Sequence, residues 1–353
     1  MRNSCDFQFS LDKADRIYEA GADVTGIVTI IPQKTMRCSG LKLELRWRTH
    51  GRGNRAQGQV ISIPVNFYEA EVSEGQSYEV PFGFTLPSGP LTYHGHNLNI
   101  DWYLKAILDA PLVPGFLDPQ TETELLVLPK EGESVNLGPN YKAPDDARRA
   151  SSNKWGSLIM AGIFGGIGLI MFLAFNAVAN SGPSIFRLFS LIPLIFVGIS
   201  VWVVFSSFRN SLASSKLGEV SVRFDKRKLV PGGSLNAKLE FHPQKQVNLV
   251  KITMTLKGFE RVVRGSGSNR KTFTHTVFEE TKELAGASIL SPAQHVNLSE
   301  SFDLPFDAPY TFVASDNELR WELECLIDTQ GIIDWKQAYQ IDVVPWVDND
   351  IIN

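Results

Sequence analysis

The chain has 353 residues, with 34 Lys and Arg against 38 Asp and Glu, for a formal net charge of −4. Its length predicts two or three domains, and the balanced charge argues against nucleic acid as a partner. Its three cysteines, Cys5, Cys38 and Cys325, are odd in number and far apart. That excludes a disulfide framework and a zinc site built from cysteines.

The first 129 residues carry the pattern of short β-strands. Apolar side chains alternate with other residues over 24–30, 41–47 and 100–108. A period of two predicts strands with one buried face. Because these strands are separated by Gly, Pro and Asn turns, we expect residues 1–129 to form an antiparallel, immunoglobulin-like β-sandwich.

Residues 130–154 are polar and without periodicity, which predicts a linker. The following 155–208 is strongly apolar. A membrane span takes roughly 20 helical residues, so two stretches in it, about 155–178 and 185–207, predict a transmembrane helical hairpin. Gly162 and Gly166 are candidates for close helix packing.

The charges beside the predicted hairpin indicate its orientation. Arg148, Arg149 and Lys154 precede it, Arg209 and Lys216 follow it, and only Arg187 lies near its turn. By the positive-inside rule, both termini and both flanking domains are expected to be cytoplasmic. The sequence thus predicts an integral, multi-pass membrane protein with the lipid bilayer as a partner.

Residues 217–346 repeat the first domain, which predicts a tandem duplication. Asp12 corresponds to Asp225, Gly21 to Gly232 and Trp102 to Trp321, with offsets between 211 and 219 residues. The strand alternation recurs as well, over 235–241, 252–256 and 319–327. We therefore expect a second β-sandwich over 217–346, and an all-β fold class apart from the hairpin.

Several short motifs together resemble the arrestin-like superfamily. They are Tyr18-x-x-Gly21 before Val24-x-Gly26-x-Val28, the run Leu41-x-Leu43-x-Leu45, Pro81-Phe82-x-Phe84-x-Leu86-Pro87, and Ile100-x-Trp102-Tyr103-Leu104. The resemblance implies two tandem β-sandwiches that act as a protein-interaction scaffold. The inserted hairpin departs from the family, and the chain has no Pro-Pro-x-Tyr motif and no long tail after the last strand. Receptor and clathrin binding are therefore not implied.

Catalytic signatures are absent from the sequence. It contains no P-loop, no G-x-G-x-x-G opening a helix, no H-E-x-x-H and no nucleophile elbow. His94-Gly-His96 is the nearest approach to a metal pair, but without a third ligand nearby it is interpreted as a pair of loop histidines. Asp303, Asp307 and Asp316 are interpreted as turn residues. We expect no enzyme activity, no cofactor and no metal.

Two basic loops at equivalent places in the repeats are the candidate recognition sites. Their members are Arg48, Arg52 and Arg55 in the first domain, and Arg261, Arg264, Arg270 and Lys271 in the second. Three interpretations stay open: solvated hairpin loops, contact with phosphorylated or acidic partner proteins, and contact with anionic lipid headgroups.

Together these features predict a membrane-anchored, non-enzymatic adaptor that presents two arrestin-like domains at the cytoplasmic face to membrane or cytoplasmic proteins. The alternative is a structural or accessory subunit of a larger membrane complex for transport, secretion or envelope assembly, held through the hairpin. An enzyme with a site assembled between the two domains is a third hypothesis.

Overall fold

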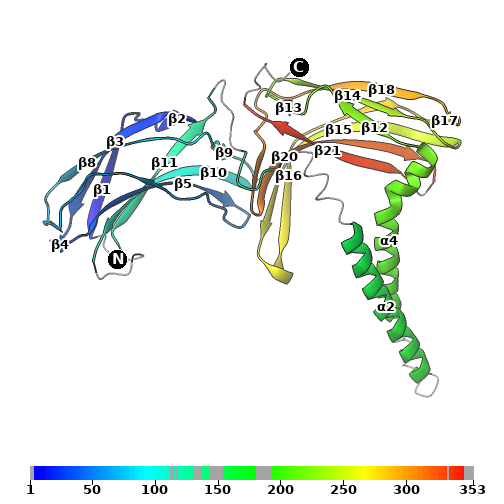
Figure 1. Ribbon diagram of the computed structural model, residues 1–353, viewed down its shortest axis with the longest axis horizontal. Coiled ribbons are helices and arrows are strands. Elements are labelled where there is room, and N and C mark those ends of the chain that lie inside the picture. Colours follow the sequence, from blue (N-terminus) through cyan, green and yellow to red (C-terminus); the bar gives the residue numbers. More distant parts are fainter. Residues whose placement is uncertain are drawn as a thin grey trace.

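The computed structural model describes residues 4–111, 115, 118–130, 137–142, 154–179, 192–331 and 334–345. Over these residues the molecule is an arch of two β-sandwiches, with a pair of helices projecting from the second (Figure 1). Most of the predicted linker and the predicted turn between the helices lie outside the described residues.

The first sandwich has a three-stranded and a six-stranded sheet. The smaller sheet has the order β1 (Cys5–Leu11), β3 (Asp23–Pro32), β8 (Tyr78–Thr85). The larger sheet has the order β2 (Ile17–Glu19), β11 (Gln120–Leu128), β10 (Leu98–Asp109), β5 (Gly40–Gly51), β6 (Ile61–Ile63), with β9 (Tyr93–His94) also paired to β10. A short pair, β4 (Met36–Arg37) and β7 (Glu71–Val72), stands apart. Alternate side chains of β5 fill the core between the sheets, as the period of two predicts.

The second sandwich repeats this strand order. Its smaller sheet is β12 (Ser221–Phe224), β14 (Ser234–Phe241), β18 (Val296–Asp303). Its larger sheet is β13 (Lys228–Leu229), β21 (Trp335–Val343), β20 (Asn317–Thr329), β15 (Val247–Arg264), β16 (Lys271–Ala285), with β17 (Ser288–Leu290) on β15 and β19 (Phe312–Ala314) on β20. A short 3-10 turn, Gly267–Asn269, joins β15 to β16.

Equivalent residues of the two sandwiches make equivalent contacts. Trp102 and Trp321 are both buried, and their indole N–H groups donate to the carbonyl oxygens of Pro90 at 2.7 Å and Pro309 at 2.9 Å. The strand pairs β2–β11 and β13–β21 are both parallel, although the neighbouring pairs are antiparallel. The similarity between the halves of the sequence therefore reflects one strand order, used twice.

The two helices, α2 (Lys154–Ala179) and α4 (Ile192–Leu217), pack on each other. A Cβ atom added at Gly165 would lie 3.1 Å from the Ser200 side chain, and one at Gly168 would lie 3.0 Å from Phe196. Gly162 and Gly166, the candidate packing residues, have no neighbouring atom within 4 Å of such a Cβ. The close approach of the helices therefore uses the other two glycines.

The predicted membrane hairpin is contradicted. A membrane crossing takes roughly 20 consecutive apolar helical residues, and in the part of the chain that the structure describes no helix meets both the length and the apolarity required. This corrects the two predicted spans, 155–178 and 185–207, and the fold class that included them. The other predictions that depend on these spans are corrected with them. They are the lipid bilayer as a partner and the integral membrane localisation with cytoplasmic domains. The same holds for the membrane-anchored adaptor and for the subunit held in a membrane complex through the hairpin.

A short segment, residues 137–142, lies against the second sandwich before the chain enters α2. The backbone of Val313 donates to the carbonyl of Leu137 at 2.8 Å, and the backbone of Asn140 donates to the carbonyl of Val313 at 3.2 Å. The Tyr141 hydroxyl donates to the carboxylate of Asp342, which is 1% exposed. We call this segment the strap; it fixes the chain to the second domain ahead of the helices.

Candidate functional site at the junction of the two domains

The two predicted basic loops meet each other where the sandwiches join. Asn54, in the loop after β5, donates from its side chain to the carbonyl of Gly265 at 3.0 Å and to the carboxylate of Asp316 at 2.8 Å. Its side-chain oxygen accepts from the backbone N–H of Gly265 at 3.0 Å, and its own carbonyl accepts from the Asn317 side chain at 2.7 Å. The loops thus bind the domains to each other through a saturated set of hydrogen bonds.

Glu260 of β15 forms the second polar contact across the junction. It is 0% exposed, and its carboxylate accepts from the Tyr93 hydroxyl at 2.7 Å and from the backbone N–H groups of His96 at 2.9 Å and Asn97 at 2.6 Å. Burial, together with this hydrogen bond, raises the pKa of Tyr93. A buried carboxylate is costly unless its oxygens are hydrogen-bonded, so Glu260 depends on donors that belong to the other domain.

Apolar and aromatic contacts surround these polar contacts. Val262, Phe312, Ala314 and Leu319 of the second domain belong to the hydrophobic core cluster of the first. The Phe312 ring meets the Trp47 ring edge to face, with centroids 5.6 Å apart. A shared core of this kind holds the domains in one relative orientation, in contrast to the loose interfaces that allow domain motion.

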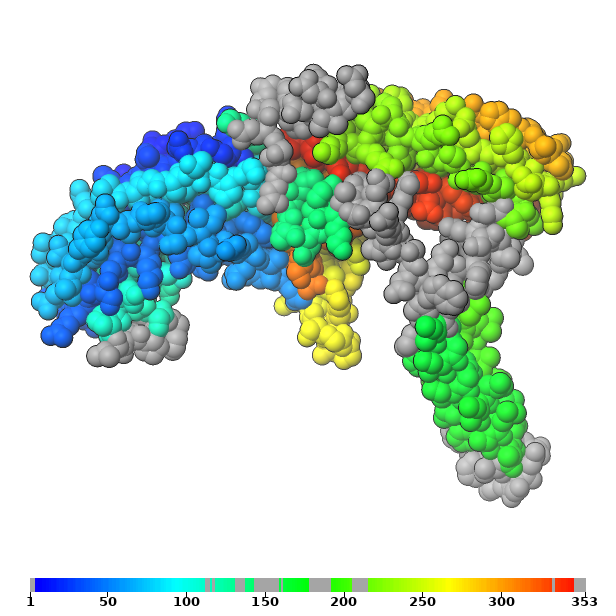
Figure 2. Space-filling model, viewed as in Figure 1, coloured from blue at the N-terminus to red at the C-terminus, as the bar shows by residue number. Residues whose placement is uncertain are grey.

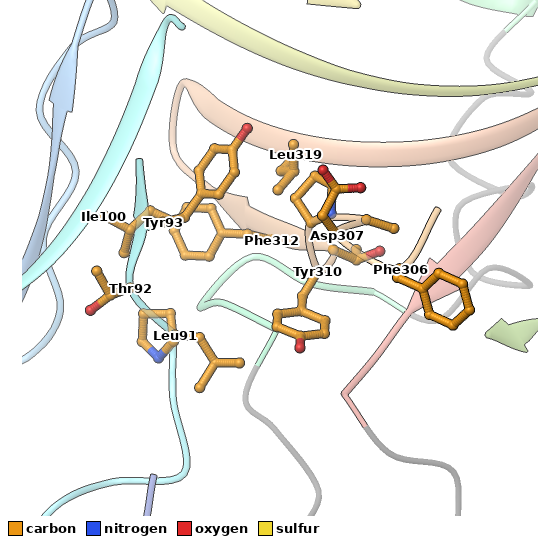
Figure 3. A pocket seen from close by; sticks show the side chains of 13 residues that line it. Leu91, Thr92, Tyr93, Ile100, Phe306, Asp307, Tyr310, Phe312 and Leu319 are labelled. Carbon is orange, nitrogen blue, oxygen red and sulfur yellow. The ribbon is translucent and has the colours of Figure 1, made fainter. Parts of the chain in front are cut away.

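A cavity of about 200 Å³ opens beside the shared core. Tyr93 and Ile100 of the first domain lie in it beside Phe312 and Leu319 of the second (Figure 3). Its lining is largely apolar, and its carboxylate, Asp307, is exposed. The cavity is suited to an apolar side chain or small ligand.

Within the described residues, three of the seven candidate basic residues form ion pairs with acidic neighbours. Arg48 binds the Glu122 carboxylate through both terminal nitrogens and lies 3.5 Å from the centre of the Tyr103 ring, and the hydrogen bond to Glu122 raises the pKa of Arg48. Arg261 pairs with Glu318 at 3.3 Å, and Arg270 pairs with Asp316 at 2.7 Å. These three side chains support strand and loop geometry.

The remaining candidates are exposed. Arg52 lies 5.8 Å from the centre of the Phe273 ring, which brings a first-domain arginine to the second-domain hairpin. Arg55, Arg264 and Lys271 are exposed as well. Recognition of a phosphorylated or acidic partner by these residues stays a prediction.

Two residues at the junction escaped the sequence analysis. Asn54 carries no signal, since the residues it contacts lie more than 200 positions away. Glu260 does carry a sequence signal, because it occupies an alternate position of β15 on the same inward face as Leu256 and Val262. Because a charged residue is almost never fully buried unless it has partners, its place on the buried face indicates a polar contact inside the molecule.

The histidines of His94-Gly-His96 lie in different surroundings. The His96 ring stacks on His275 of the second domain, with centroids 4.3 Å apart. His94 instead meets Asp101 on the outer face of the first sandwich. The two side chains therefore do not form a metal pair with each other.

Comparison with known proteins identifies no family for the chain and a distant structural similarity. No protein-family model and no curated protein matches the chain. Among solved structures, it is similar to the sporulation control protein Spo0M from Bacillus subtilis, with 20% sequence identity and a TM-score of 0.29. The match covers 35% of this chain and 48% of that one, so it spans about half the length of that protein. A likeness this distant carries no argument about function.

Proposed function

We propose that the chain is a non-enzymatic protein-interaction scaffold, in which two arrestin-like β-sandwiches in fixed orientation bind an extended segment of a partner protein. The observation that carries the proposal is the free edge of β16. This 15-residue strand ends the order of the larger sheet in the second domain, so over the described residues its outer side pairs with no strand.

The free part of this edge is the first half of β16. Near its other end, Lys282 donates to the carbonyl of Ser301 on β18 at 2.5 Å, which closes the sandwich there. The first half projects with β15 from between the domains, as the yellow lobe of Figure 2. A row of exposed threonines, Thr272, Thr274 and Thr276, lies along it. Unpaired backbone groups on such an edge can add an extended peptide as a further strand.

The rigid junction supports the same proposal. Because the orientation of the domains is fixed before a partner arrives, little conformational entropy is lost on binding. An enzyme site between the domains is the rival hypothesis, and the cavity is the place to expect it. Its largely apolar lining, however, favours binding over acid–base chemistry.

The test is site-specific photo-cross-linking in cells, with a photoreactive amino acid at Thr274 on β16. The matched control carries the same group at Gln8, which is exposed on β1, the edge strand of the first domain's smaller sheet. We expect a discrete cross-linked protein from position 274 and none from position 8. Equal yield from both positions, or no product from position 274, contradicts strand addition at β16.

A further inference from the structure

The outer face of the first sandwich gathers histidine and carboxylate side chains around one residue, Asp101. The strand register explains the gathering. Asn99 of β10 pairs with His50 of β5 on one side and with His94 of β9 on the other. Since alternate residues of a strand share a face, Asp101, two positions on, lies between these two histidines.

The side chains converge as the register implies. The Nε2 atom of His94 lies 2.5 Å from one carboxylate oxygen of Asp101, and the Nε2 atom of His50 lies 2.8 Å from the other. The Asp101 side chain is only 6% exposed, whereas those of His50 and His94 are 31% and 55% exposed. Both oxygens of a nearly buried carboxylate are therefore met by imidazole nitrogens that solvent can reach.

Glu124 of β11 completes the cluster. It pairs with Tyr103, two residues beyond Asp101 on the same face, and ligand atoms of His94, Asp101 and Glu124 all lie within 4.8 Å of one another. We propose that these three residues, with His50 beside them, bind a divalent transition-metal ion of the Zn²⁺ type.

The donor set fits this class of ion. His94, Asp101 and Glu124 offer one imidazole nitrogen and two carboxylate oxygens, donors that Zn²⁺ accepts at about 2.0–2.2 Å from each atom. The fourth position of a tetrahedral site is then open to water, or to His50 if its ring moves towards the ion. A charge of +2 cancels the charges of Asp101 and Glu124. Bringing the ligands to those distances requires side-chain rotation, which is open to His94 and Glu124 because both are exposed.

Neighbouring groups fix the position of His50. The Tyr103 hydroxyl lies 2.7 Å from the Nε2 atom of His50, so this nitrogen would have to give up the hydroxyl before it could bind the ion. Arg48 covers the Tyr103 ring and is itself fixed by Glu122.

The test is calorimetric titration of the untagged full-length chain with zinc chloride. We expect one Zn²⁺ bound per chain, and a loss of affinity of about tenfold or more in His94→Ala. Glu124→Gln, at an exposed position, serves as the second variant in case the first fails to fold. The visible absorption of bound Co²⁺, which depends on its coordination geometry, gives an independent readout.

Two matched controls come from the chain itself. His96→Ala removes the neighbouring histidine, and His242→Ala removes one ring of a stacked pair in the second domain whose centroids lie 4.6 Å apart. Both should bind Zn²⁺ as the unaltered chain does. The proposal is overturned if no stoichiometric binding occurs, if His94→Ala and Glu124→Gln both bind normally, or if either control loses the ion.

Discussion

Glu260 illustrates how a single side chain joins two domains. All three of its described donors belong to the first domain, although it lies on a strand of the second. Removing it leaves two backbone N–H groups and a phenol without their acceptor, and of these the N–H of Asn97 is in a buried residue. The cost of such orphaned groups exceeds the gain from the original hydrogen bonds.

We therefore expect Glu260→Ala to lower the free energy of unfolding by about 2–4 kcal/mol. Glu260→Gln should cost less, because one amide oxygen still accepts. The midpoint of urea unfolding, followed by tryptophan fluorescence, measures both changes. Glu283→Ala, at an exposed position of β16, is the matched control and should leave the midpoint unchanged. A change in Glu260→Ala no larger than the control's would show that the contact contributes nothing.

At the scale of elements, the strap is held by an unusual buried acid. Burial raises the pKa of Asp342, while the hydrogen bond from Tyr141 and the charges of Lys228 and Arg227 oppose the rise. Among the described residues, one oxygen of this carboxylate, Oδ1, has no hydrogen-bond partner. The folded state therefore favours the protonated form more than the unfolded state does, so this group makes folding less stable as the pH rises above the ordinary Asp value of about 3.9.

Asp342→Asn removes this dependence and keeps an oxygen that accepts from Tyr141. We expect the variant to gain stability relative to the unaltered chain as the pH rises from about 4 towards neutrality, with the difference vanishing at lower pH. Urea unfolding across that pH range measures it. Tyr141→Phe should act in the opposite direction and steepen the pH dependence. If stability varied with pH in the same way in the unaltered chain, Asp342→Asn and Tyr141→Phe, Asp342 would not be the source of the pH dependence.

The β-strands were the features best predicted from the sequence. Alternation over 24–30, 41–47 and 100–108 indicated strands where the structure has β3, β5 and β10, because burial of one strand face leaves a local pattern. The apolar run over 155–208 indicated helices as well, but its interpretation as membrane spans is contradicted. The lack of formal charge over most of this run does not by itself make a helix both long and apolar enough to cross a membrane.

The contacts at the junction could not be predicted from the local pattern of single strands. Asn54 and Asp316 touch although 262 positions separate them, and no local period encodes such a pair. The same holds for the cluster around Asp101, where His50 and His94 come together through strand pairing alone. The sequence analysis compared His94 with His96, its neighbour in the chain, whereas the sheet makes His50 its neighbour in space.

At the scale of the whole molecule, the junction predicts a single domain orientation. Spin labels on cysteines introduced at Gln8 and Ile289, both exposed, should give one narrow distance distribution by pulsed electron resonance. The native thiols interfere little, because burial raises the pKa of Cys5 to about 11 and that of Cys325 to about 12, and thiols label as thiolates.

Combining Asn54→Ala with Glu260→Ala should broaden that distribution, since it removes the hydrogen bonds that the Asn54 and Glu260 side chains make across the junction. Glu283→Ala is again the control and should keep the distribution narrow. A broad distribution in the unaltered chain would contradict the rigid junction. An unchanged distribution in the double variant would show that the shared apolar core suffices alone.

The strap has a mechanical consequence. The chain is fixed to the second sandwich by residues 137–142 before α2, and it returns to the core of that sandwich at Leu217, where α4 ends. The chain is therefore attached to the same domain on both sides of the helical pair. A force applied along the helices loads the second sandwich directly. In the part of the chain that the structure describes, this load passes to the first sandwich through the junction, where Glu260, Asn54 and the apolar core around them carry it.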